Sequence, residues 1–256
     1  VAVNAGGYPE LDRFTAACRR AEADGKFFLY QSAASFVKSY VQSPHRPYLG
    51  GRRDRGAAAS QGPGSDPGPG DEQPGGPGIV IAGSYVPQTT RQLEKLSAAR
   101  GTSMIEVDVK GVLGDPDETC REVGNRIAES VRAQRTPVVY TSRKELTFAK
   151  RDDRQRAGQA VSKALSRIVR ELSFAPSFII AKGGITAHVV LTDGLEISLG
   201  RVAGQCAAGV PALILPEGHR FSGILYAIFP GNVGDDSALA ELYSRLSEAG
   251  TEAAAP

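Results

Sequence analysis

Short apolar runs alternate with helix-length amphipathic stretches from residue 79 almost to the end of this 256-residue sequence. The apolar runs predict strands at 79–82, 104–109, 137–140, 178–181, 212–215 and 224–229. Between them, apolar residues spaced by three and four predict helices from Thr89 onward and at 117–134, 161–172, 187–191 and 239–246. Strands that are apolar along their whole length must be covered on both faces. The pattern therefore predicts an α/β fold, a mostly parallel or mixed sheet flanked by helices on both faces.

A glycine- and proline-rich stretch separates this pattern from the start of the chain. Residues 50–78 read GGRRDRGAAASQGPGSDPGPGDEQPGGPG. This composition cannot bury enough apolar surface to offset the entropy of ordering the segment, so it predicts a disordered linker. We therefore expect three parts, at 1–49, 50–78 and 79–250. In the first part, the apolar residues at 1–3, the helical spacing over 11–21 and the run Phe27–Tyr30 predict a β-α-β step.

Three loops that follow predicted strands are rich in glycine and hydroxyl groups. They cover residues 83–90, 182–186 and 230–236. Ligands of such sheets bind beyond the carboxyl ends of the strands. Backbone N–H groups at the start of a helix, without bulky side chains around them, can bind a phosphate. In the first loop, Thr89 and Gln92 have the spacing of a capping box. None of the loops has the spacing of a P-loop or of the dinucleotide fingerprint.

Composition and charge exclude several classes of protein. The 30 Lys and Arg residues nearly balance the 28 Asp and Glu residues, and they form no basic stripe, so we expect no nucleic-acid partner. No window approaches 18 consecutive apolar residues, so we expect no membrane span and a cytoplasmic protein. Cys18, Cys120 and Cys206 lie far apart without zinc-site spacing, which predicts buried free thiols.

Four motifs follow one another in the second part of the chain. They are Gly83-Ser84 followed by Thr-Thr-x-Gln, the string from Lys182 to His188 (KGGITAH), Gly204-Gln205 with Gly209-Val210-Pro211, and the string from Phe229 to Gly234 (FPGNVG). Together they resemble the C-terminal nucleotide-binding domain of the four-carbon acid sugar kinases, over residues 79 to about 247. Residues 1–42 resemble the end of the N-terminal substrate domain of that family.

The resemblance implies a function and a set of contacts. The function is ATP-dependent phosphorylation, with Mg²⁺, of a hydroxyl on threonate, erythronate or an oxo-tetronate acid. The implied ATP contacts are Ser84, Gly183, Gly184, Ile185, Thr186 and Gly231. The family's Asp-Asp motif, which supplies the base for the attacking hydroxyl, has no counterpart here, so the catalytic residue is unknown. Because the chain opens on Val-Ala-Val-Asn-Ala, we expect a fragment that is inactive alone.

Several further side chains are candidates with two interpretations each. His188 could contact phosphate, and Lys182 could neutralise a γ-phosphate, although a lysine at a strand end is usually solvated. Asp235 and Asp236 are expected to cap the last helix, with magnesium ligation as the alternative. His45 and His219 are expected to be solvent-exposed.

Two other functions stay open at this point. A non-catalytic module would bind ATP and phosphorylate nothing. An NAD-dependent oxidoreductase is disfavoured because the glycine fingerprint is missing. Assembly into a homo-oligomer also stays open.

Overall fold

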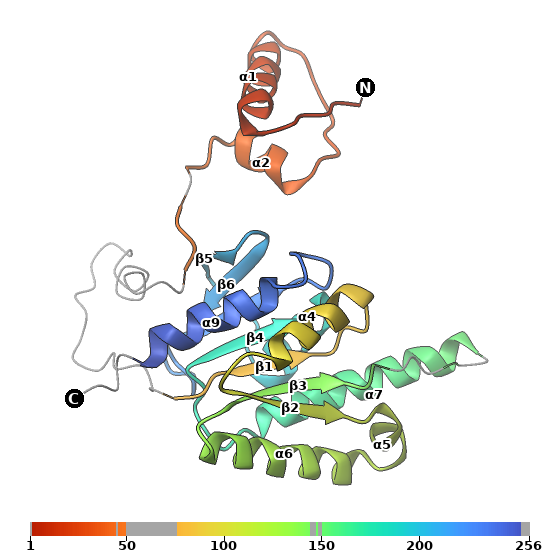
Figure 1. Ribbon diagram of the computed structural model, residues 1–256. Helices are drawn as coiled ribbons and strands as arrows, with labels where there is room; N and C mark the ends of the chain where they lie inside the picture. Colours follow the sequence, from red (N-terminus) through yellow and green to blue (C-terminus); the bar gives the residue numbers. More distant parts are fainter. Residues whose placement is uncertain (1, 45, 50–75, 144–146, 148–149, 252–256) are drawn as a thin grey trace. The chain divides into compact units, whose positions relative to one another are not determined.

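The computed structural model describes residues 2–44, 46–49, 76–143, 147 and 150–251 (Figure 1). The chain divides into two compact units, Val1–Pro47 and Tyr48–Pro256. Most of the predicted linker lies outside the described residues. Within the described part of the chain, no helix is long and apolar enough to cross a membrane. All three cysteines are buried and free, as predicted.

The first unit contains two helices, α1 (Tyr8–Ala23) and α2 (Ala34–Tyr40). The predicted β-α-β step is wrong, because residues 2–5 and 26–33 form no strand. The ring of Tyr30 packs on Phe36 at 4.8 Å, whereas Phe27 and Leu29 are more than 90% exposed. An apolar run becomes a strand only beside a second strand that takes up its N–H and C=O groups, and the described residues of this unit provide none.

The described residues of the second unit form a seven-stranded sheet in the order β2-β3-β1-β4-β7-β6-β5. The strands are β1 (Ile79–Ala82), β2 (Thr102–Val107), β3 (Thr136–Thr141), β4 (Phe178–Lys182), β5 (Val202–Ala207), β6 (Val210–Ile214) and β7 (Leu225–Phe229). The five strands from β2 to β7 in this order are parallel, and the β7-β6 and β6-β5 pairs are antiparallel. This mixed sheet confirms the α/β prediction.

Helices cover both faces of the sheet, as Figure 1 shows. They are α4 (Pro87–Ser97), α5 (Val109–Gly114), α6 (Pro116–Arg132), α7 (Arg151–Arg170), α8 (Gly184–Val189), the π-helix η1 (Val190–Gly194) and α9 (Ala238–Thr251). Ile79 and Ile81 of β1 belong to one buried cluster with α6 and α7, and Val80 and Ala82 belong to a second with α4 and α9. Each of these side chains is fully buried, which explains why β1 is apolar throughout.

In the second unit, the sequence analysis did not predict α5 or β5. Helix α5 begins because the Asp108 carboxylate accepts hydrogen bonds from the N–H groups of Lys110 and Gly111, which also ends β2 at Val107 and not at 109. Strand β5 is an edge strand of mostly small residues, only one of which is buried, and the Leu49 N–H group donates to its Gln205 carbonyl.

Candidate functional site

A pocket of about 740 Å³ lies beyond the carboxyl ends of β1 and β4. Its walls come from the segments after β1, β3, β4 and β7, from Val109 at the start of α5 and from one side of α7. The structure brings all six predicted contact residues to its lining: Ser84, Gly183, Gly184, Ile185, Thr186 and Gly231. The convergence follows from the parallel register, since the carboxyl ends of β1, β4 and β7 meet at one edge of the sheet.

The loops after β1 and β4 touch each other through glycines. A Cβ atom on Gly83 would lie 2.4 Å from Thr186 Oγ1, and one on Gly183 would lie 2.9 Å from Ser84 Cβ. Gly183 also has φ +111°, which side chains rarely tolerate. Gly184 differs, because a Cβ there would meet no atom within 4 Å. The first two glycines therefore close the wall, and Gly184 leaves open space in front of it.

Lys182, the last residue of β4, holds the loop after β7 in place. Its Nζ donates to the carbonyl oxygens of Pro230 (2.6 Å) and Gly231 (3.2 Å) and lies 4.0 Å from the centre of the Phe229 ring. The side chain is fully buried, and this burial lowers its pKa to about 8. Lys182 does not line the pocket, so it is neither the phosphate contact nor the solvated strand-end lysine that the sequence suggested.

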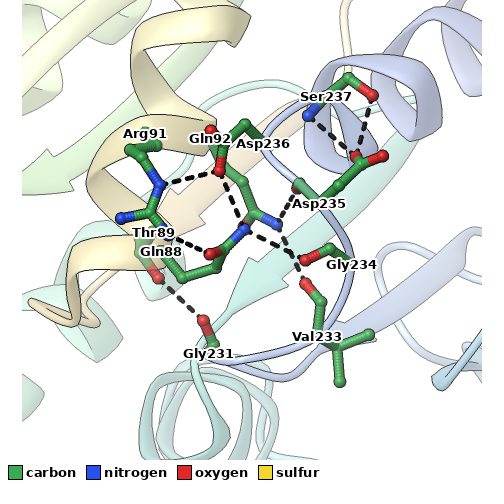
Figure 2. Close-up of polar contacts among 10 residues, drawn as sticks. All are labelled: Gln88, Thr89, Arg91, Gln92, Gly231, Val233, Gly234, Asp235, Asp236 and Ser237. Carbon is green, nitrogen blue, oxygen red and sulfur yellow. Dashed lines mark hydrogen bonds and ion pairs between the residues drawn. The ribbon is translucent and has the colours of Figure 1, made fainter.

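The same loop is tied to α4 from the side, as Figure 2 shows. Thr89 Oγ1 donates to the Gly231 carbonyl (3.3 Å), and Gln92 Nε2 donates to the carbonyls of Val233 (3.0 Å) and Asp235 (2.7 Å). The predicted capping box is wrong, since α4 begins after Val86 and both polar side chains are fully buried. The two residues connect the first and third loops of the site instead.

Asp235 and Asp236 have different roles just before α9 (Figure 2). The Asp235 carboxylate accepts hydrogen bonds from the N–H and hydroxyl groups of Ser237, which lower its pKa. Ser237 precedes α9 (Ala238–Thr251), so these bonds form a turn before the helix, and helix capping by Asp235 stays a prediction. Asp236 pairs instead with Arg91 (2.8 Å) and accepts from Gln88 (3.2 Å). Neither aspartate lines the pocket, and the described residues contain no group of three or more His, Cys, Asp or Glu that could hold a metal ion.

Arg143, just after β3, fixes the backbone next to Ser84. Its guanidinium donates to the Ser84 carbonyl (2.5 Å), to the Val86 carbonyl (3.4 Å) and to Thr90 Oγ1 (2.7 Å). Burial lowers the pKa of this arginine. Arg143 thus holds the Ser84 loop from outside the pocket, whereas Ser84 itself lines the pocket.

Sequence reasoning missed the wall that α7 contributes. Helix α7 lines the pocket with Arg151, Arg154, Gln155, Ala157, Gly158, Val161, Ser162 and Leu165. The Arg154 guanidinium lies 3.4 Å from the Tyr85 hydroxyl of the first loop. Two arginines and no carboxylate occur among the described lining residues, so the electrostatic balance favours an anionic ligand. The sequence feature that could have pointed to this wall is Gly158, a glycine within a helical pattern.

The two described histidines do not line the pocket. His188 is exposed on α8 and does not line it. His219 was expected to be solvated, but it is half-buried between the Leu195 carbonyl and the Phe221 N–H group (3.0 Å each). A neutral ring with its proton on Nε2 satisfies both partners. His45 lies outside the described residues.

Comparison with known proteins agrees with this geometry. Residues 79–239 match the family described as the nucleotide-binding C-terminal domain. No curated protein sequence is significantly similar to the chain. Among solved structures, a Haemophilus influenzae protein with the DUF1537 family description is 18% identical, with a TM-score of 0.57 over 96% of this chain and 53% of its own.

Two further structures share the fold. A domain of unknown function (DUF1537) from Bordetella bronchiseptica, crystallised with citrate as a domain-swapped dimer, is 19% identical, with a TM-score of 0.54 over 69% of this chain and 41% of its own. A Salmonella typhimurium protein is 20% identical, with a TM-score of 0.58 over 94% of this chain and 50% of its own. The chain therefore spans about half the length of these relatives.

The family match covers more than half of the chain and includes all six predicted contacts. It confirms the resemblance that the four motifs indicated. The chain belongs to the family of nucleotide-binding C-terminal domains, the domain found in the four-carbon acid sugar kinases.

Proposed function

We propose that this chain carries the ATP site of a kinase that phosphorylates a hydroxyl of a four-carbon sugar acid, namely threonate, erythronate or an oxo-tetronate. The observation that supports it is the convergence of Ser84, Gly231 and the Gly183–Thr186 turn on one pocket whose described lining contains arginines and no carboxylate. Phosphoryl transfer requires positioning and charge neutralisation more than covalent chemistry by the protein.

The residues of the pocket have separate parts in this proposal. Gly183 and Gly184 allow a phosphate to approach the backbone, where the first N–H groups of α8 have no acceptor within the helix. The hydroxyls of Ser84 and Thr186 donate to phosphate oxygens. Arg151 and Arg154 lower the free energy of the bound negative charge.

The transfer breaks the bond between the γ-phosphorus and the oxygen that bridges it to the β-phosphate. It forms a bond from that phosphorus to the acceptor hydroxyl oxygen, and the hydroxyl proton passes to a base. We assign that base to no residue of this chain. We propose residues 1–49 as the end of the substrate domain, 50–78 as the linker and 79–250 as the nucleotide domain, in a cytoplasmic protein.

The donor set argues against a magnesium site built by this chain alone. Mg²⁺ in proteins is held by carboxylates together with substrate phosphates. The described residues that line the pocket offer hydroxyl and amide oxygens but no carboxylate. We therefore expect Mg²⁺ to enter on the phosphates of ATP.

A non-catalytic ATP-binding module is the second candidate. The observation that favours it is the same lack of a carboxylate among the described pocket residues, since a hydroxyl needs a base to become a nucleophile. The two functions predict the same nucleotide binding and differ only in turnover.

Calorimetric titration with ATP and Mg²⁺ tests the site. We expect the wild-type chain to bind ATP, and we expect Gly184→Val to weaken this binding by at least about tenfold, because the added side chain fills the space in front of the turn. Gly114→Val is the matched control, since a Cβ there also meets no atom within 4 Å and Gly114 does not line the pocket. Equal affinity in both variants would contradict the site.

Turnover separates the two candidates. ADP release is followed with D-threonate, L-threonate or D-erythronate, for the chain alone and with the N-terminal domain of a related kinase added. The kinase proposal predicts acid-dependent ADP release in the mixture and none for the chain alone. ATP binding without turnover in either case would favour the non-catalytic module.

A further inference from the structure

The side of α7 that faces the pocket changes character along its length. Arg154, Gly158, Val161 and Leu165 follow one another at spacings of four, three and four, so they form one stripe of the helix. All four line the pocket, and the buried Ala157 lies beside them. The stripe is charged at Arg154, has no side chain at Gly158 and is apolar beyond it.

The structure of α7 does not explain why residue 158 is a glycine. A glycine inside a helix destabilises it relative to alanine, and Gly158 lies in the first half of the 20-residue α7. Its backbone does not have a positive φ, and an added Cβ would meet no atom within 4 Å. Neither the backbone conformation nor packing against the described residues therefore requires glycine here. What the missing side chain provides is open room in the pocket next to Val161.

A second exposed surface lines the same pocket. Ile185, on the first turn of α8, is 75% exposed although it is a large aliphatic residue. An aliphatic side chain exposed at a pocket gains free energy when an apolar ligand surface covers it. In ATP, the faces of the base are the apolar surface that could cover it. The phosphates instead require the N–H and hydroxyl donors of the glycine-rich loops.

We propose that the nucleobase lies against α7 at Ala157, Gly158 and Val161, with Ile185 as its other apolar contact. This subsite rests on the function proposed above and divides the pocket into two regions. The phosphates take the loop side, at Ser84 and the Gly183–Thr186 turn. The base takes the helix side, where Gly158 makes room for it.

Displacement of a ribose-labelled fluorescent ATP analogue tests the subsite, with ATP and inorganic tripolyphosphate as competitors. The variant is Gly158→Leu, whose side chain would occupy the position of the base. The matched control is Gly124→Leu on α6, where an added Cβ also meets no atom within 4 Å and which does not line the pocket. Leucine is a better helix former than glycine, so both variants should melt no earlier than the wild type.

The proposal predicts that Gly158→Leu weakens ATP binding at least about tenfold relative to Gly124→Leu. It also predicts that binding of tripolyphosphate, which has no base, changes less than about twofold. Unchanged ATP affinity would overturn the subsite, and so would an equal loss for both competitors, because the side chain would then lie in the path of the phosphates. Absence of ATP binding to the wild type would instead overturn the proposed function.

Discussion

Lys182 is a lysine at the end of a strand that lies in the protein interior. Its ammonium group is fully buried, and its recorded partners are two carbonyl oxygens and the face of one aromatic ring. These contacts hold the backbone at Gly231, which lines the pocket. Burial lowers the pKa of Lys182 to about 8 from an ordinary value of 10.5, so the charged form is less favoured in the folded chain than in the unfolded chain.

This shift predicts a specific pH dependence of stability. Below pH 8 the lysine is protonated in both the folded and the unfolded chain. Between about pH 8 and 10.5 the unfolded chain binds a proton that the folded chain has released, so the free energy of unfolding rises with pH. Denaturant unfolding of the wild type and of Lys182→Met between pH 7.5 and 10 measures the difference. Parallel pH profiles of the two proteins would contradict the assignment.

At the scale of elements, α4 and the loop before α9 act as one unit through Gln92. Its amide donates to two backbone carbonyls, and the side chain is fully buried (Figure 2). We expect Gln92→Leu to lower the free energy of unfolding by about 2 kcal/mol, because it removes two hydrogen bonds to the loop and each contributes about 1 kcal/mol. Gln88, on the same helix, also contacts the loop, at Gly234 and Asp236, but nearer the surface, so Gln88→Leu is the control, with an expected loss below about 0.5 kcal/mol.

Equal destabilisation by the two glutamine variants in urea titrations would show that α4 and the loop are not coupled through Gln92. The coupling also reaches the pocket, since Thr89 on the same helix donates to the Gly231 carbonyl. We therefore expect Gln92→Leu to weaken ATP binding as well, while Gln88→Leu leaves it unchanged.

The sequence predicted those strands and helices whose apolar residues follow directly from which faces are buried. The apolar runs at 79–82 and 178–181 are β1 and most of β4, because strands buried on both faces are mostly apolar. The run Phe27–Tyr30 has the same pattern but forms no strand, since pairing depends on a neighbour and not on the run itself. Thr89 and Gln92 have capping spacing, but the helix begins too early for them to cap it.

At the scale of the whole molecule, the candidate site follows from topology. Three loops distant in sequence were predicted to carry the phosphate contacts, and the order β1-β4-β7 brings them to one edge of the sheet. The α7 wall could not be predicted, because the side of a helix that faces a pocket depends on how the helix packs on the sheet. The burial of Lys182 could not be predicted either, because the spacing of residues in the sequence does not show which way the side chain points at the end of β4.

The most direct measurement is a crystal structure of the chain grown with a non-hydrolysable ATP analogue and Mg²⁺. The account predicts phosphate density within hydrogen-bonding distance of the backbone at Gly184 and Ile185 and of the hydroxyls of Ser84 and Thr186, inside the pocket of about 740 Å³. Nucleotide density at any other place on the chain, with this pocket filled by solvent, would contradict it.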